Sequence, residues 1–356
     1  MIGVGFWFAK KHADFDDFFL AGRSLTTPIL ITTLISTYYG IDVLFGDTQL
    51  AFTDGVVAWF GYARPTYAFF LIAALLLAKR LRENDFKSLP DILYFYYGDN
   101  ARYVGALTSF IYSLPALSLY GFGMLAEVVL GLDPIIGMFV LGGIALVYTL
   151  TGGFWAVAFT DSIQFVMMCI VIAISFPFAM SFIGGFDSMI ELLPESYFDT
   201  LGDLNIFLII IYASTGLSIL VEPTFYQRIF AAKSYKNVRN ALILGIFIWG
   251  SYDWIITVLA MSAKTAVIQG VLPSSVAPDA ALLTIVIAAL PAGIVGLFIA
   301  GVLSTEMSTL DSYCLVAGGN VSYDIYRPAF KPEAVSYTHL RAHETEADLV
   351  CRLLLE

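Results

Sequence analysis

Long apolar stretches alternate with short polar connections along most of the chain. Because lipid offers the backbone no hydrogen-bond partner, a membrane-crossing helix needs about 20 mostly apolar residues. By that rule residues 1–9 resemble the end of a helix, and residues 280–323 divide at Pro291 into a short helix and a complete span. The other complete spans are predicted at residues 26–46, 56–78, 103–130, 134–151, 156–184, 204–222 and 238–262. The pattern predicts an all-α protein with eight complete membrane helices.

Composition excludes a water-soluble protein. Apolar residues (AVILMFWYC) make up 59% of the 356 residues and charged residues 13%, and the mean hydropathy is +0.81, whereas soluble domains carry roughly 25% charge. The 18 basic and 29 acidic residues give a net charge of −11, which leaves no surface for nucleic acid. Three cysteines are too few and too scattered for a disulfide framework. We therefore expect an integral membrane protein whose surroundings are the lipid bilayer.

The basic residues predict the orientation of the spans, because cytoplasmic loops carry an excess of Lys and Arg. If residues 10–25 are cytoplasmic, the outer loops hold only Lys264. The inner loops then hold Lys10, Lys11, Arg23, Lys79, Arg80, Arg82, Lys87, Arg102, Arg228, Lys233, Lys236, Arg239, Arg327 and Lys331. This asymmetry supports the positions of the spans independently of hydropathy.

Six charged residues fall within or at the ends of predicted spans, where a charge at mid-membrane costs about 2.5–3.5 kcal/mol. They are Asp42, Arg64, Glu127, Glu222, Asp253 and Glu306. We expect Asp42, Arg64 and Glu306 to lie in the protein interior, and Glu127 and Glu222 to lie at headgroup depth. Asp42 and Arg64 enter adjacent spans from the same outer loop, so we predict that they form a pair, since a buried pair costs less than either charge alone.

The first complete span is unusually polar for a membrane helix. Its hydroxyl residues, Thr32, Thr33, Ser36 and Thr37, precede Tyr38-Tyr39-Gly40. One interpretation is a helix that unwinds where it lines a cavity, which frees carbonyl groups for a cation. The other is a face of small residues packed against a neighbouring helix. The span alone leaves both open.

The last span carries a second row of hydroxyl groups. They belong to Thr305, Ser308, Thr309 and Ser312, whose spacing of i, i+3, i+4 and i+7 places them on one helical face. Hydroxyl and carbonyl oxygens are hard ligands that suit an alkali cation. The alternative is that each hydroxyl bonds back to its own helix and only packs. This span alone favours packing.

Four segments together resemble the sodium:solute symporter family. They are DFFLAGRSL at 17–25, YTLTGGFWAVAFTDSIQ at 148–164, QRIFAAKS at 227–234 and MSTLDSYCLVAGGNVSYDIYRP at 307–328. The resemblance covers residues 1 to about 332. It implies the leucine-transporter fold, two inverted five-helix repeats around a midplane site, here incomplete because core helices nine and ten are absent.

The resemblance also implies a sodium site between core helices one and eight. Its ligands would be the carbonyls of Ser36, Tyr39 and Thr305 and the hydroxyls of Ser308 and Thr309. Asp161 would lie near the inner exit route of the ion. With Asp42, Arg64, Glu222 and Asp253, it forms our set of candidates for solute binding or gating.

The end of the chain does not resemble the family. Residues 333–356 include VSYTHLRAHETEADLVCRLLLE, which looks like translated adapter read-through at the end of an assembled gene fragment. Its His339, His343 and Cys351 form no known ligand spacing. We therefore expect a symporter domain at residues 1–332, truncated at both ends, and a tail without function. We also expect that these 356 residues by themselves do not transport.

The predicted function is sodium-coupled symport of a small polar solute such as an amino acid, sugar, vitamin or organic acid. No enzymatic chemistry is implied, and the expected location is the plasma membrane, as a multi-pass protein of a bacterial inner membrane. Departures from the sugar-carrying and proline-carrying patterns around Glu222 prevent either solute from being assigned. The alternatives are the sensory module of a membrane histidine kinase, and a proton-coupled or uncoupled carrier in which Asp42 or Glu306 titrates.

Overall fold

The computed structural model describes residues 15–40, 42–149 and 153–330, with the side chains of 42–43 and 147–149 left out. Regular structure within these ranges is helical, apart from one isolated bridge between Leu25 and Ala232. Five helices there are long and apolar enough to cross a membrane, and a bent pair makes a sixth candidate span. The five are Ala58–Glu83, Asp99–Leu130, Gly153–Ile183, Tyr235–Ile268 and Ala292–Phe330. By this measure six of the eight predicted spans are found within the described residues, because the first span is broken and the helix from Pro134 is described only as far as Thr149.

The first predicted span is two helical pieces joined by a break. Helix α3 (Thr27–Tyr38) ends at Tyr38, and the chain resumes as the π-helical turn η2 (Asp42–Asp47) and α4 (Thr48–Asp54). Twelve residues of α helix rise only about 18 Å, too little to cross the hydrocarbon core alone. The break at Tyr39 and Gly40 confirms the interpretation of this span as an unwound helix.

A second break lies in the bent pair. Helix α13 (Ile206–Thr215) and the 3₁₀ segment η6 (Gly216–Leu220) meet α14 (Pro223–Ala231) at 43°. Proline disfavours helical dihedrals in the residue before it, and Glu222 is extended at φ −75° and ψ 109°. The predicted span therefore does not end at Glu222 but bends there. The bend turns Glu222 into the bundle, where it is 3% exposed. Its depth in the bilayer stays a prediction.

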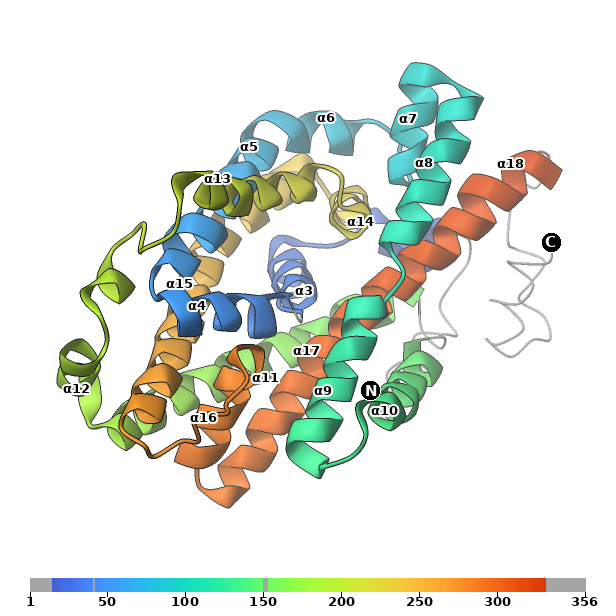
Figure 1. The fold of residues 1–356 in the computed structure, drawn as a ribbon. Helices are drawn as coiled ribbons and strands as arrows, with labels where there is room; N and C mark the ends of the chain where they lie inside the picture. The colour runs from blue at the N-terminus through green and yellow to red at the C-terminus, as the bar shows by residue number, and fades with distance from the viewer. Residues whose placement is uncertain (1–14, 41, 150–152, 331–356) are drawn as a thin grey trace.

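Helix α3 lies at the centre of the bundle (Figure 1). It packs against the three longest helices, α11 (Gly153–Ile183), α15 (Tyr235–Ile268) and α17 (Ala292–Gly319). Helix α17 continues through the π-helical segment η8 (Asn320–Tyr326) into α18 (Arg327–Phe330). It begins after Pro291, its N-cap, which separates it from α16 (Ala281–Ala289) as predicted. This arrangement brings the two rows of hydroxyl groups face to face.

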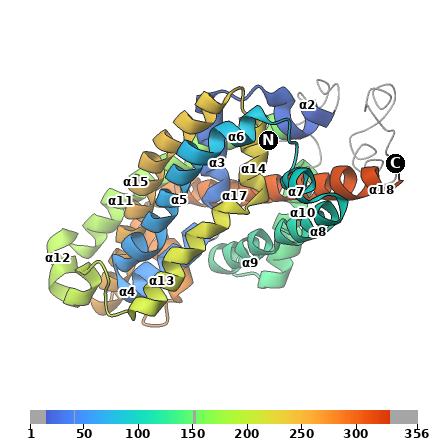
Figure 2. The same cartoon turned by 90° about the horizontal axis from the view of Figure 1, so that it is seen from above.

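The remaining long helices surround this centre. The second span joins η3 (Ala58–Ala63), α5 (Arg64–Ile72), η4 (Ala73–Leu77) and α6 (Ala78–Glu83). Helix α7 (Leu89–Tyr97) precedes α8 (Asp99–Tyr112), which breaks at Ser113–Pro115 before α9 (Ala116–Leu130). Helices α9 and α10 (Pro134–Thr149) pack as a pair at one side of the bundle (Figure 2). Their backbones approach closely through Gly123 and Gly137, a use of small residues common between membrane helices.

Gly55 provides a test of the packing at the end of α4. Its φ is +78°, and an added Cβ would lie 2.2–2.7 Å from backbone atoms of Tyr197. Gly98 has a similar φ of +83° but open space around it. We expect Gly55→Ala to lower the thermal unfolding midpoint clearly more than Gly98→Ala, because only the former adds a clash to the unfavourable dihedral. Equal shifts in unfolding scans of the two variants would show that the Tyr197 contact is not restrictive.

Candidate functional site

A buried polar cluster lies where α3, α11, α14 and α17 meet. Asp161 of α11 is fully buried, and its Oδ1 accepts a hydrogen bond from Ser308 Oγ of α17 at 2.6 Å. Its Oδ2 accepts a hydrogen bond from Thr33 of α3. Ser36 Oγ donates to Ser308 Oγ at 2.8 Å. The cluster thus links the row of hydroxyls on α3 to the row on α17 through one carboxylate.

The cation of this cluster is Arg228 of α14, whose side chain is completely buried. Its Nη2 lies 3.4 Å from Asp161 Oδ2 and donates to Ser312 Oγ at 2.6 Å and to the Thr37 hydroxyl. Its Nε donates to the Thr33 carbonyl at 3.3 Å. A buried arginine is stable only when paired and hydrogen-bonded in this way.

The sequence prediction for Arg228 was therefore wrong, since it was counted with the inner-loop basic residues. All nine residues of α14 are buried, because the bend at Glu222 carries this helix into the bundle rather than out of it. The signal that could have found Arg228 was its place in QRIFAAKS, a segment quoted for the family resemblance.

Four of the predicted sodium ligands, Ser36, Thr305, Ser308 and Thr309, are linked by hydrogen bonds near the broken end of α3. Ser36 and Tyr39 are buried there, and Thr309 Oγ1 of α17 donates to the Thr37 carbonyl at 3.0 Å. Thr305 Oγ1 bonds back to the Gly301 carbonyl at 3.1 Å, so this hydroxyl follows the packing interpretation. Hydroxyl, carbonyl and carboxylate oxygens gather in one place, and this donor set fits a hard alkali cation.

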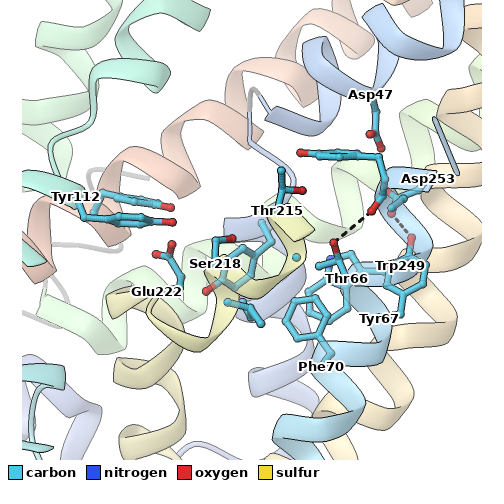
Figure 3. Close-up of a pocket in the computed structure, with 16 residues that line it drawn as sticks. Asp47, Thr66, Tyr67, Phe70, Tyr112, Thr215, Ser218, Glu222, Trp249 and Asp253 are labelled. Carbon is cyan, nitrogen blue, oxygen red and sulfur yellow. Dashed lines mark hydrogen bonds between the residues drawn. The ribbon is translucent and has the colours of Figure 1, made fainter. Parts of the chain in front are cut away.

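Beside this cluster is a cavity of about 160 Å³. Figure 3 shows Glu222 on one side of it and Asp253 and Asp47 on the other. Tyr67 donates a hydrogen bond to Asp253 Oδ2. Tyr38, which directly follows the hydroxyl row of α3, forms part of the wall. The cavity and the polar cluster thus share one segment of α3.

The other charged candidates are distributed differently. Glu306 is fully buried, which confirms its expected place in the interior, while Glu127 is exposed. Arg64 was expected inside but is exposed, with its guanidinium 6.0 Å from the Trp59 ring and 5.7 Å from the Phe60 ring. Aromatic faces at the bundle surface thus accommodate this charge. The side chain of Asp42 lies outside the described residues, so its pairing with Arg64 stays a prediction.

A family model for the sodium:solute symporter family matches residues 18–353. The chain belongs to this family. The osmoregulated proline transporter OpuE of Bacillus subtilis is 26% identical over 354 residues, which cover 94% of this chain and 70% of the relative. The sodium/proline symporter of Escherichia coli is 25% identical, covering 98% and 71%. A high-affinity choline transporter of Caenorhabditis elegans is 30% identical over 193 residues, covering 50% and 33%.

A solved structure gives the same fold. This structure, a substrate-bound outward-open state of a sodium-coupled sialic acid symporter, matches with a TM-score of 0.83 at 17% identity. The match covers 99% of this chain and 76% of the other. Fold and family together confirm the predicted all-α, leucine-transporter-like class. The protein is a multi-pass membrane transporter that couples solute movement to sodium, not an enzyme.

Proposed function

We propose that sodium binds between the broken end of α3 and α17, and that the solute binds in the adjacent cavity. The ion would take the carbonyls of Ser36, Tyr39 and Thr305 and the hydroxyls of Ser308 and Thr309. The observation that carries the proposal is the contact of Ser308 and Thr309 across the interface, with Ser36, Asp161 and the Thr37 carbonyl. Thr309 Oγ1 also bonds to the Thr305 carbonyl of its own helix at 3.2 Å, so this hydroxyl links the carbonyls of both helices.

Asp161 would lie at the start of the ion's exit route from this site toward the cytoplasmic side. Its carboxylate is within hydrogen-bonding distance of Ser308, a proposed ligand, and it also approaches Arg228. An ion leaving Ser308 would therefore meet a carboxylate that Arg228 already partly neutralises. Because its charge is partly neutralised, Asp161 would bind the departing ion weakly and transiently rather than tightly.

The coupling of ion and solute would pass through residues 36–39. Ser36 and Tyr39 belong to the proposed ion site, and Tyr38 between them lines the cavity. Sodium that fixes this last turn of α3 and the break after it would also fix one wall of the cavity. The solute would then lose less conformational freedom on binding, which is positive coupling between two sites.

Linkage gives the test of this function. If sodium tightens solute binding by some factor, the solute must tighten sodium binding by the same factor. We expect this reciprocity in the purified chain, followed by tryptophan fluorescence because Trp249 lines the cavity. Proline, pantothenate and choline are the solute probes, and potassium replaces sodium in the control.

Coupling typically amounts to about 1–3 kcal/mol, or roughly 5–150-fold in affinity. Binding that responds equally to sodium and potassium would contradict the proposal. Binding that follows pH and ignores sodium would instead favour a proton-coupled carrier, for which the buried Glu306 is the candidate. The solute is proposed to be small and polar and the location to be the plasma membrane, as the multi-pass fold and the named relatives support.

A further inference from the structure

The cavity beside the proposed ion site has a one-sided charge. Sixteen described residues line it, and three of them are acidic, namely Asp47, Glu222 and Asp253. None of those sixteen is Lys, Arg or His. A cavity for an anion or for the carboxylate of an amino acid would be expected to present a cation or a cluster of strong donors.

Glu222 is the acidic side chain whose position is most closely defined by its surroundings. The extended backbone before Pro223 directs it into the bundle, and Thr224 Oγ1 donates to its Oε1 at 2.8 Å. The rings of Tyr112 and Tyr313 stack with centroids 6.5 Å apart, and their hydroxyls donate to the same carboxylate. These donors hold Glu222 in one orientation at the side of the cavity (Figure 3). They are neutral groups and bring no positive charge to the cavity.

Arg228 adds no positive charge to the lining of the cavity. It does not line the cavity, and its guanidinium is engaged by Asp161, Ser312 and the Thr33 carbonyl. Its charge is thus offset by Asp161 in the neighbouring cluster.

Aromatic rings form much of the remaining wall of the cavity. Phe70 and Trp249 stack with ring centroids 4.3 Å apart, and Tyr38 stands nearly perpendicular to both, at 6.0 and 6.3 Å. Tyr62 and Tyr67 also line the cavity. Aromatic faces attract ammonium groups, most strongly where water is excluded. Rings and carboxylates around one cavity are therefore complementary to an organic cation.

We propose that the transported solute is an organic cation, an amine or quaternary ammonium compound that carries no carboxylate. This inference rests on the proposed function, because it concerns the solute of the same cavity. The positive group lies against Glu222 or against the Asp47 and Asp253 side, with the aromatic rings covering its alkyl groups. Thr66, Thr215 and Ser218 remain for the polar end of such a molecule.

The test compares two probes that differ in charge and little in shape. Choline carries a quaternary ammonium, and 3,3-dimethylbutan-1-ol has a neutral carbon in its place. In sodium, the purified protein should bind choline at least about tenfold more tightly than the neutral isostere, a difference within the range of a desolvated cation–aromatic contact. Pantothenate serves as the anionic probe and should bind more weakly than both.

A matched pair of variants assigns the preference to the cavity. Glu222→Gln should reduce the preference for choline over its isostere severalfold or more, while Glu127→Gln, on an exposed carboxylate, should leave it unchanged. Sodium titration without any solute separates this inference from the proposed function, because only the latter fails if sodium does not bind. Equal binding of choline and its isostere, or tighter binding of pantothenate, would overturn the inference. The probe comparison on the unaltered protein keeps the test decisive even where Glu222→Gln does not fold.

Discussion

Alanine at Ser308 or Thr309 is expected to raise the sodium concentration for half-saturation by about tenfold or more. Each change removes one hydroxyl oxygen from the proposed ion site, and a lost polar partner in a buried place costs about 1–3 kcal/mol, where 1.4 kcal/mol is tenfold in affinity. Alanine favours the helix at least as well as Ser or Thr, so expression should change much less. Sodium titration by tryptophan fluorescence measures the effect.

Ser304→Ala is the control for this prediction. Ser304 lies on the same helix, but about 100° around it from Thr305, and its hydroxyl donates a weak hydrogen bond to the Met167 sulfur at 3.9 Å. Its removal should leave the sodium dependence close to that of the parent. If all three variants keep the parental sodium dependence, the hydroxyls serve packing alone and the proposed site is wrong.

The second large effect is expected at the buried ion pair. Arg228→Gln and Asp161→Asn should each lower the free energy of unfolding by about 3–5 kcal/mol, because each leaves the partner charge buried without compensation. The double variant should be clearly milder than the sum, since it removes both charges together. Chemical unfolding of the four proteins in detergent gives the double-mutant cycle.

Arg64→Gln provides the comparison for these variants. It removes the same type of side chain from an exposed position, where substitutions usually change stability by no more than about 0.5 kcal/mol. If the losses in free energy of unfolding of the two single variants simply add in the double variant, Arg228 and Asp161 do not stabilise the fold as a pair. If Arg64→Gln lowered the free energy of unfolding as much as Arg228→Gln, burial of the arginine would not be the cause of the loss.

Hydropathy and motifs were sufficient for most of the fold. A membrane helix must satisfy its backbone internally, so the length of each apolar run predicts a helix almost directly, as for α11 and α15. Pro291 separated α16 from α17 as predicted, because proline cannot continue a helix on its N-terminal side without strain. The four family segments were also sufficient for the family, and one of them contains Ser308 and Thr309 of the proposed ion site.

The breaks in the helices could be predicted only in part from the sequence. Glycine and hydroxyl residues allow a helix to unwind at Tyr39 and Gly40, but the same residues also suit close packing. The bend at Glu222 was missed, although Pro223 was visible, because a proline can equally begin a new helix outside the membrane. Hydropathy averages over such points and therefore places span ends poorly.

By itself the sequence determined the helical membrane class, most of the spans, the family and the two rows of hydroxyls. Only the tertiary structure decided which charges are buried and which partners they meet. Arg228 is buried because α14 turns inward, whereas Arg64 is exposed at the bundle surface beside the rings of Trp59 and Phe60. Burial of a charge depends on groups from other helices, here Asp161 for Arg228. Arg228 and Asp161 are far apart in the sequence, so no local pattern around either residue could specify their contact.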